Sequence, residues 1–315
     1  MKKTLVILGN GFDLNIGLRT SYRDFMNSTE CHTLLKDRNN YLLNKIFINF
    51  KLKNWIDLES ELKKFAQNSN SYDNQMIEKF RIEYKSLQSA LCGYLRRIEL
   101  EATGSGTETP EILLKDSHAG KLLRFMTNYP ERFEILTFNF TDLNRIAQAM
   151  CYPADLRYTH IHGSLAEENI IIGFEDSSEH VDKFCFMIKT FNNYYSGKKV
   201  RKLLDSYDDI IIFGHSLGNI DYPYFSKFFN DISSPDSIQA REVNLCIVTY
   251  NETSKLDILE QLRRINDNRT NILFDQNKVS IICTQYYTTQ CEFYHYLKGY
   301  EIKFELEEKL SNLLY

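Results

Sequence analysis

Six short apolar runs, rich in β-branched residues, recur along the chain and constrain its fold more than any other feature. The runs span residues 4–8, 133–138, 170–172, 210–213, 243–248 and 279–283. Runs that are apolar on both faces are typical of parallel strands covered by helices on each side. Helical periodicity fills residues 119–127, 141–150, 181–193, 254–264 and 292–298. This alternation predicts an α/β fold, a Rossmann-like parallel sheet with helices on both faces.

The region from residue 21 to 112 interrupts this alternation, because it contains no good strand and shows helical periodicity instead. Apolar residues recur at three- and four-residue steps from Met76 to Leu100, which predicts a long helix. We therefore predict a helical insertion over residues 21–112, after the first strand of a single α/β nucleotide-binding domain of residues 1–315. The insertion is expected to lie over the ligand pocket. Residues 102–111 are predicted to form a mobile loop and residues 301–315 a final helix.

Composition argues against several classes of protein. The formal net charge of −4 over 315 residues gives no electrostatic case for nucleic-acid binding. The seven cysteines form no CxxC pair, which argues against a disulfide framework or a zinc knuckle and for a reducing compartment. No apolar stretch approaches the ~20 residues of a membrane span, and the N-terminus lacks a signal-peptide pattern. We expect a cytoplasmic protein without a metal site or a membrane segment.

The first apolar run ends at the glycine-rich sequence GNGFD, and a third glycine follows. Glycine lets the chain turn tightly and lets a phosphate approach the main chain, while the N–H groups of a following helix favour the negative charge. We predict a nucleotide pocket here, with these binding residues: Gly9, Asn10, Gly11, Phe12, Asp13 and Gly17. Because the spacing is not GxGxxG, a plain strand-to-helix turn accounts for the pattern equally well.

Three later segments also place small and polar residues at predicted strand ends, at residues 137–141, 160–164 and 214–221. Ligands of an open parallel sheet bind outside the carboxyl ends of the strands, so these segments should converge on one crevice. The residues predicted to line it are Thr137, Asn139, His162, Gly163, Gly214, Ser216 and Asp221.

Several of these residues have a simpler structural interpretation. Asn139 is also a suitable cap for the helix that begins near residue 142, and Asp221 fits an N-cap with a proline close behind it. His160 and His162 alternate on an extended segment, so only one of them needs to face the crevice. In the insertion, Trp55 is predicted to be a buried anchor, and Glu59 is able to face the pocket.

Taken together, the segments resemble the AbiH family of bacteriophage abortive infection proteins. The resemblance is carried by GNGFD at residues 9–13, GLRTSYRDF at 17–25, WIDLE at 55–59, TFNFT at 137–141, HIHGS at 160–164, IGF at 172–174 and GHSLGNIDYPYF at 214–225. It implies a role in defence against phage, with a phage-derived trigger or a partner protein. It does not by itself specify the chemistry.

The same order of segments is similar to the sirtuin-type NAD-binding fold and to the NAD-hydrolysing defence proteins built on it. This second resemblance implies that Gly9, Gly11 and Gly17 cradle a pyrophosphate, that Asn139 lies near the nicotinamide ribose, that His162 is catalytic, and that Gly214 and Ser216 close the nucleotide site. The aspartate that such proteins carry two places after the asparagine is Thr141 here. The four zinc cysteines of deacetylases have no counterpart, so protein deacylation is not expected.

The sequence therefore predicts an NAD⁺ hydrolase, with NAD as substrate or ligand, His162 as base and Asn139 orienting the ribose or a water. A neutral imidazole, with an ordinary pKa near ~6.5, can accept a proton at neutral pH. One alternative is a nucleotide-sensing protein that acts through a partner protein or through the helical insertion. A homo-oligomer is among the expected assemblies. Another is an α/β-hydrolase, because GHSLG matches G-x-S-x-G, with Ser216 as nucleophile and Asp275 and His295 as its partners.

Overall fold

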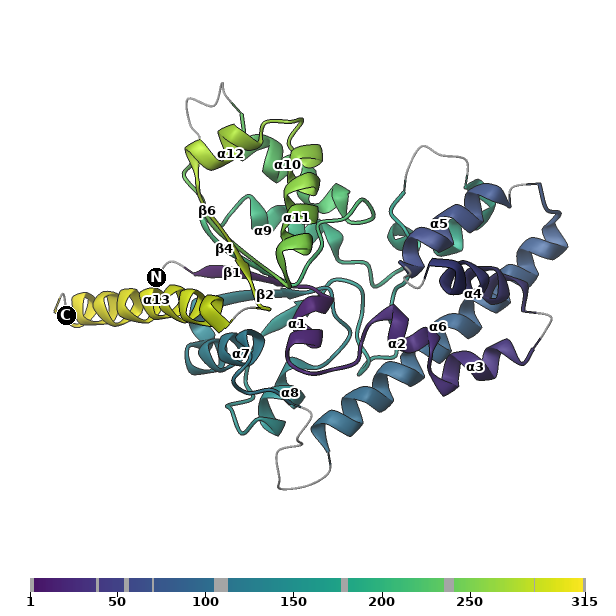
Figure 1. Ribbon diagram of the computed structural model, residues 1–315, viewed down its shortest axis with the longest axis horizontal. Helices are drawn as coiled ribbons and strands as arrows, with labels where there is room; N and C mark the ends of the chain where they lie inside the picture. The colour runs from purple at the N-terminus through teal and green to yellow at the C-terminus, as the bar shows by residue number, and fades with distance from the viewer. Residues whose placement is uncertain are drawn as a thin grey trace.

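The structure is a computed structural model that describes residues 3–37, 40–53, 57–69, 71–104, 113–176, 181–234, 241–285 and 287–313. Its centre is a sheet of six parallel strands in the order β3-β2-β1-β4-β5-β6. Figure 1 shows the sheet, with β1, β2, β4 and β6 labelled. The strands are β1 Thr4–Leu8, β2 Phe133–Thr137, β3 Tyr158–His160, β4 Asp209–Phe213, β5 Asn244–Thr249 and β6 Lys278–Cys283. The strand order reverses direction between β1 and β4, which makes this the switch point of the sheet.

Helices cover both faces of the sheet. The core on one face contains Val6 and Leu8 together with α7 (His118–Asn128), α8 (Leu143–Ala149) and α13 (Tyr287–Leu313). The core on the other face contains Leu5 and Ile7 together with α9 (Gly197–Leu204), α10 (Tyr222–Ile232), α11 (Glu252–Ile265) and α12 (Thr270–Gln276). Because successive strand residues point to opposite faces, a run that is apolar throughout fills both cores. The predicted α/β fold with a doubly covered parallel sheet is confirmed.

Five helices separate β1 and the short helix α1 (Asn10–Asn15) from α7 and β2. They are α2 Tyr22–Met26, α3 Thr29–Leu35, α4 Tyr41–Lys53, α5 Leu58–Asn68 and α6 Asn74–Thr103. Four of them begin at a capping side chain, since Ser21, Ser28, Asp57 and Asp73 each accept a hydrogen bond from a first-turn N–H. Figure 1 shows this helical group beside the sheet. The predicted helical insertion after the first strand is confirmed.

The segment between β3 and α9 connects the insertion to the sheet, and here two predictions are wrong. Residues 170–172 form no strand, because the Ile172 carbonyl accepts a hydrogen bond from the Tyr84 hydroxyl at 2.6 Å and the Ile171 N–H donates to the His162 carbonyl at 2.7 Å. These contacts hold the segment against α6 and away from the sheet edge.

Residues 181–193 form two short 3₁₀ helices, Asp182–Met187 and Lys189–Phe191, in place of the predicted α-helix. Phe174 accounts for the difference, because its N–H donates to Met187 and its carbonyl accepts from the Lys189 N–H. Backbone groups that pair with Phe174 cannot continue an α-helical ladder.

The other element predictions differ in smaller ways. No apolar run marked β3, which has three residues at the sheet edge, although residues 160–164 were predicted to follow or end a strand. The helices α9 and α12 were not predicted. Residues 292–298 and 301–313 belong to one continuous helix, α13. Trp55 and residues 105–112, which include most of the predicted mobile loop, lie outside the described residues. None of the helices in the described ranges is both long and apolar enough to cross a membrane.

Candidate functional site

A cavity of about 700 Å³ lies at the carboxyl ends of the strands, beside the switch point formed by β1 and β4. Eight of the predicted site residues line it: Gly9, Asn10, Asp13, Asn139, His162, Gly214, Ser216 and Asp221. The insertion contributes another part of the wall, which includes Tyr22, Arg23, Asp57, Glu59, Leu91 and Leu95. Four separate strand ends and the insertion therefore meet around one cavity.

The glycines after β1 and β4 allow the two turns to pack directly against each other. A Cβ atom on Gly11 would lie 2.6 Å from the Gly214 Cα, and one on Gly9 would lie 2.6 Å from the His215 Cα. The Gly11 N–H donates to the Gly214 carbonyl at 2.9 Å, and the Gly9 N–H donates to the Phe213 carbonyl at 2.9 Å. Both amides are therefore engaged within the protein.

The remaining predicted site residues are not among those lining the cavity. Phe12 is buried against Phe213, Gly17 has a φ of 106°, and Gly163, with a φ of 79°, packs against the Asn169 carbonyl. Thr137 is buried, and its Oγ1 accepts a hydrogen bond from the Asn139 N–H at 3.1 Å. These residues shape the loops around the cavity.

The side chain of Asn139 is held in one orientation. Its Nδ2 donates to the Gly9 carbonyl at 3.1 Å and to Asp13 Oδ1 at 2.7 Å. Both partners can only accept when Asp13 is ionised, so the amide nitrogen faces them and Oδ1 is left as an acceptor. The capping interpretation of Asn139 is wrong, because the side chain of Asp142 caps α8.

Asp13 is buried beneath Asn139. Its second oxygen accepts a hydrogen bond from the Thr141 hydroxyl at 2.8 Å. Burial raises the pKa of Asp13 to about 7, although the hydrogen bonds from Thr141 and Asn139 oppose the shift. Thr141 therefore supports this carboxyl, a role that its place in the sequence did not suggest.

His162 lines the cavity, whereas His160 does not. The Nδ1 atom of His160 lies 2.8 Å from the Asn139 carbonyl, which can only accept, so this histidine supports the site from outside. The Nε2 atom of His162 lies 3.1 Å from the Tyr224 hydroxyl, and its ring meets Phe138 edge-on at 5.1 Å. Burial and the nearby Lys189 ammonium hold the pKa of His162 well below 6.5, so its imidazole is neutral at pH 7.

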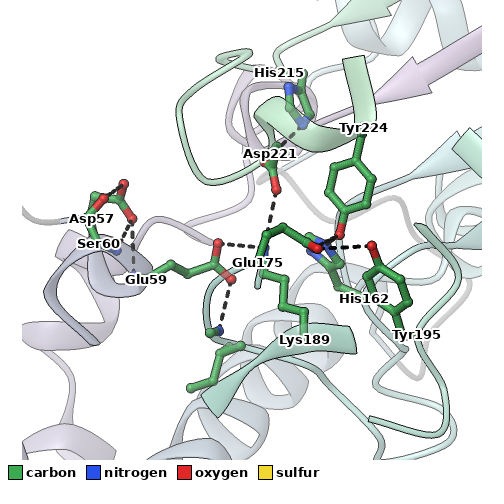
Figure 2. Close-up of polar contacts among 12 residues, drawn as sticks. Asp57, Glu59, Ser60, His162, Glu175, Lys189, Tyr195, His215, Asp221 and Tyr224 are labelled. Atoms are coloured by element: carbon green, nitrogen blue, oxygen red, sulfur yellow. Dashed lines mark hydrogen bonds and ion pairs between the residues drawn. The ribbon is translucent and has the colours of Figure 1, made fainter. Parts of the chain in front are cut away.

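A fully buried lysine joins the insertion to the turn after β4 (Figure 2). The Lys189 ammonium lies 2.9 Å from Glu59 Oε2 and 3.2 Å from Asp221 Oδ1. The other Asp221 oxygen lies 3.3 Å from His215 Nε2. The Leu217 N–H donates to His215 Nδ1, so Nε2 carries the ring proton and donates to Asp221.

The charges of this network depend on burial and on pairing. Burial raises the pKa of Glu59 to about 8, although the Lys189 ammonium opposes the shift. Burial also disfavours the charges of Asp221 and Lys189, but their mutual attraction outweighs it. The pKa of Asp221 is therefore held below its usual range and that of Lys189 above its usual range. Asp221 precedes α10 but makes no side-chain capping bond, so the N-cap interpretation is wrong.

Comparison with known protein families identifies the family of this chain. The model of the family "Bacteriophage abortive infection AbiH" matches residues 5–240. The chain belongs to the AbiH family. No curated protein matches it significantly. Family membership supports a role in anti-phage abortive infection, and the matched region contains every predicted residue that lines the cavity.

Sequence reasoning missed several residues that build this AbiH site. Lys189 was missed because it lies in a segment with apparent helical periodicity, and a lysine in an amphipathic helix ordinarily lies on the solvent face. Glu175, Tyr195 and Tyr224 also form part of the network behind His162, although none of them lines the cavity. The signal for Tyr224 was its position in the segment GHSLGNIDYPYF, which also supplies Asp221.

The structure does not assemble the hydrolase triad of Ser216, Asp275 and His295. Ser216 follows the carboxyl end of β4, whereas Asp275 lies in α12, just before the amino end of β6. The strands are parallel, so these two ends lie on opposite sides of the sheet. Strands of five or six residues separate these two sides by roughly 17–20 Å. The helix after Ser216 begins only at Tyr222, and His295 is exposed on α13. The α/β-hydrolase interpretation is therefore wrong.

No group of three or more His, Cys, Asp or Glu side chains in the described ranges is arranged to hold a metal ion.

Proposed function

We propose that this AbiH protein hydrolyses NAD⁺ at the nicotinamide–ribose bond within the cavity at the carboxyl ends of the strands. The main support is that two hydrogen-bond acceptors, the side-chain oxygen of Asn139 and a ring nitrogen of His162, belong to residues that line one cavity. Asn139 uses both amide hydrogens on the protein, and neutral His162 has a ring nitrogen that can accept a proton. Such a pair suits a water molecule or a ribose hydroxyl, because both present O–H donors. The cavity volume of about 700 Å³ suits a small-molecule ligand.

The charges around the cavity also favour this reaction. Asp13, Asp57, Glu59 and Asp221 line it together with Arg23. Asp221 is held ionised by Lys189 and His215, whereas burial raises the pKa of Asp13 to about 7 and that of Glu59 to about 8. The bond to nicotinamide breaks through a ribosyl cation-like transition state, and carboxylates near developing positive charge stabilise it. For the pyrophosphate the cavity offers the exposed Ser216, since the Gly9 and Gly11 amides are already engaged.

The reaction requires one water and releases one proton. The water oxygen forms a bond to the anomeric carbon of the ribose as the bond to the nicotinamide nitrogen breaks, and nicotinamide leaves with the electron pair. His162 takes the proton that the water loses, while the Asn139 oxygen orients the water or a ribose hydroxyl. General-base catalysis of this kind typically contributes ~10²–10⁴-fold to the rate.

The direct test is the release of nicotinamide from NAD⁺ by the purified protein, followed by chromatography. We expect His162→Ala to reduce turnover by about 10²–10⁴-fold, because the base is removed. His32→Ala is the matched control, since His32 is exposed on α3, and it should retain wild-type turnover. Unchanged turnover in folded His162→Ala would refute the assignment of this base.

The same protein separates hydrolysis from nucleotide sensing. Calorimetry with a carbocyclic NAD⁺ analogue measures binding without turnover. The NAD⁺ content of phage-infected cells measures hydrolysis in the presence of any phage-derived trigger. Binding with no loss of NAD⁺ in infected cells would favour a sensor that acts through a partner. Loss of NAD⁺ that depends on His162 supports the hydrolase.

A further inference from the structure

We propose that Tyr224, held by Glu175 and Tyr195, positions His162 and determines which ring nitrogen carries the proton. The kinetic consequence of this inference rests on the proposed function. The protonation pattern itself can be measured without any substrate. None of the three residues is among those that line the cavity, so they act through His162 and do not touch the ligand.

The hydroxyl groups behind His162 have a defined direction (Figure 2). Tyr224 donates to Glu175 Oε1, and Tyr195 donates to Glu175 Oε2 at 3.1 Å. A tyrosine hydroxyl has one hydrogen, so Tyr224 can only accept from its other neighbour, His162 Nε2, at 3.1 Å. The proton of the neutral imidazole therefore lies on Nε2, and Nδ1 is the basic nitrogen.

Burial makes the hydrogen bonds between His162, Tyr224 and Glu175 difficult to replace. Tyr224 is 1% exposed, and Glu175 and His162 are also buried, so water does not substitute readily for a lost partner. An aromatic cluster fixes the rings, because Phe138 contacts both His162 and Tyr224 edge-on, with centroids 5.1 Å and 5.5 Å apart. His162 thus has little freedom to rotate and exchange its two nitrogens.

The network also bears on the step in which His162 takes a proton. An imidazolium at this position is opposed by the Lys189 ammonium and by His215, and it is favoured by Asp221. The Glu175 carboxyl lies on the far side of Tyr224, where the Nε2–H bond points. Burial raises the pKa of Glu175, but the hydrogen bonds from Tyr224 and Tyr195 favour its ionised form. A carboxylate placed behind a base in this way orients the ring and stabilises the cation that forms.

The test is long-range ¹H–¹⁵N NMR of protein labelled with ¹⁵N-histidine, at pH 7 and without ligand. The signals of His162 are identified by their loss in His162→Gln. We expect wild-type His162 to be neutral with the proton on Nε2, and Tyr224→Phe to populate both neutral forms. Tyr158→Phe is the matched control, because its hydroxyl also donates to a carboxylate, Asp142, but lies outside the cavity wall.

Kinetics supply the second measurement. We expect Tyr224→Phe to lower kcat for NAD⁺ cleavage by about 10- to 100-fold with KM changed by less than about twofold, because the base is mispositioned while the cavity is intact. A wild-type proton on Nδ1, or a charged His162 at pH 7, overturns the inference. The expected NMR pattern in a protein that cleaves no NAD⁺, either purified or in phage-infected cells, would refute the proposed function and leave this inference standing.

Discussion

Asp13 shows how a single residue of the site responds to its depth in the protein. Its side chain is 1% exposed, and its two oxygens accept hydrogen bonds from Asn139 and Thr141. Two hydrogen bonds do not compensate fully for lost hydration, so burial raises its pKa to about 7. The carboxyl that orients Asn139 therefore titrates near neutral pH.

This pKa makes stability depend on pH in a defined direction. Folded Asp13 keeps a proton that the unfolded chain releases near pH 3.8, so its contribution to stability falls as pH rises from about 4 to about 7. Asp13→Asn removes this dependence, and its amide can still accept from Asn139 and donate to Thr141. Between pH 5 and 8 the free energy of unfolding of the variant should rise by about 2–3 kcal/mol relative to wild type.

Urea denaturation at several pH values measures this difference. The matched control is Asp275→Asn, because Asp275 is exposed on α12, far from the cavity. A constant offset between Asp13→Asn and wild type at every pH would contradict the burial argument. So would an equal pH-dependent change in the control.

At the scale of elements, glycine allows the turns that follow the neighbouring strands β1 and β4 to pack against each other. The two strands pair in parallel, and their following turns remain in contact because Gly9, Gly11 and Gly214 have no side chains. This packing creates the floor of the cavity without a long glycine loop. The glycine pattern therefore has a structural cause that operates whether or not a phosphate binds.

Gly11→Ala tests this role. A Cβ atom there would lie 2.6 Å from the Gly214 Cα, a backbone contact that cannot be relieved by a rotamer change. We expect a loss of about 1–3 kcal/mol in the free energy of unfolding. Gly93→Ala on α6 is the matched control, because its Cβ would meet nothing within 4 Å. A helix position of this kind should gain about 0.5–1 kcal/mol. Equal effects of the two substitutions in urea denaturation would disprove the packing explanation.

At the scale of the whole molecule, Lys189 connects parts that are distant in sequence. Its ammonium pairs with Glu59 of the insertion and with Asp221 between β4 and α10. The same two carboxylates line the cavity. The insertion and the sheet are thus joined by a buried ion network at the wall of the candidate site.

Lys189→Met should be strongly destabilising, because it leaves the buried Asp221 carboxylate and the Glu59 carboxyl without their shared cation. We expect a loss of about 3–5 kcal/mol in the free energy of unfolding, measured by urea denaturation. Lys227→Met is the matched control, since Lys227 also bridges two carboxylates, Asp205 and Asp231, but its side chain is 61% exposed. Exposed pairs of this kind contribute about 0–1 kcal/mol. A loss below about 1 kcal/mol for Lys189→Met would show that the network does not stabilise the fold.

The fold was largely predictable because its signals are local. An apolar strand that fills two cores must be apolar at every position, so five of the six predicted runs correspond to strands of the sheet. The exceptions lie where tertiary contacts replace local preference. Residues 170–172 have a strand-like composition, but they pair with Tyr84 and His162 and not with the sheet.

The sequence by itself determined the parallel sheet, the helical insertion and the strand ends that surround the cavity. The signals for these features, apolar periodicity and turn residues, depend only on residues that are close together in the sequence. Only the tertiary structure decided which polar groups face that cavity and in what state. Lys189, Glu175 and Tyr224 look like ordinary surface or core residues in sequence. Their partners lie tens of residues away, and burial and pairing, which set charge and proton position, exist only once those partners meet.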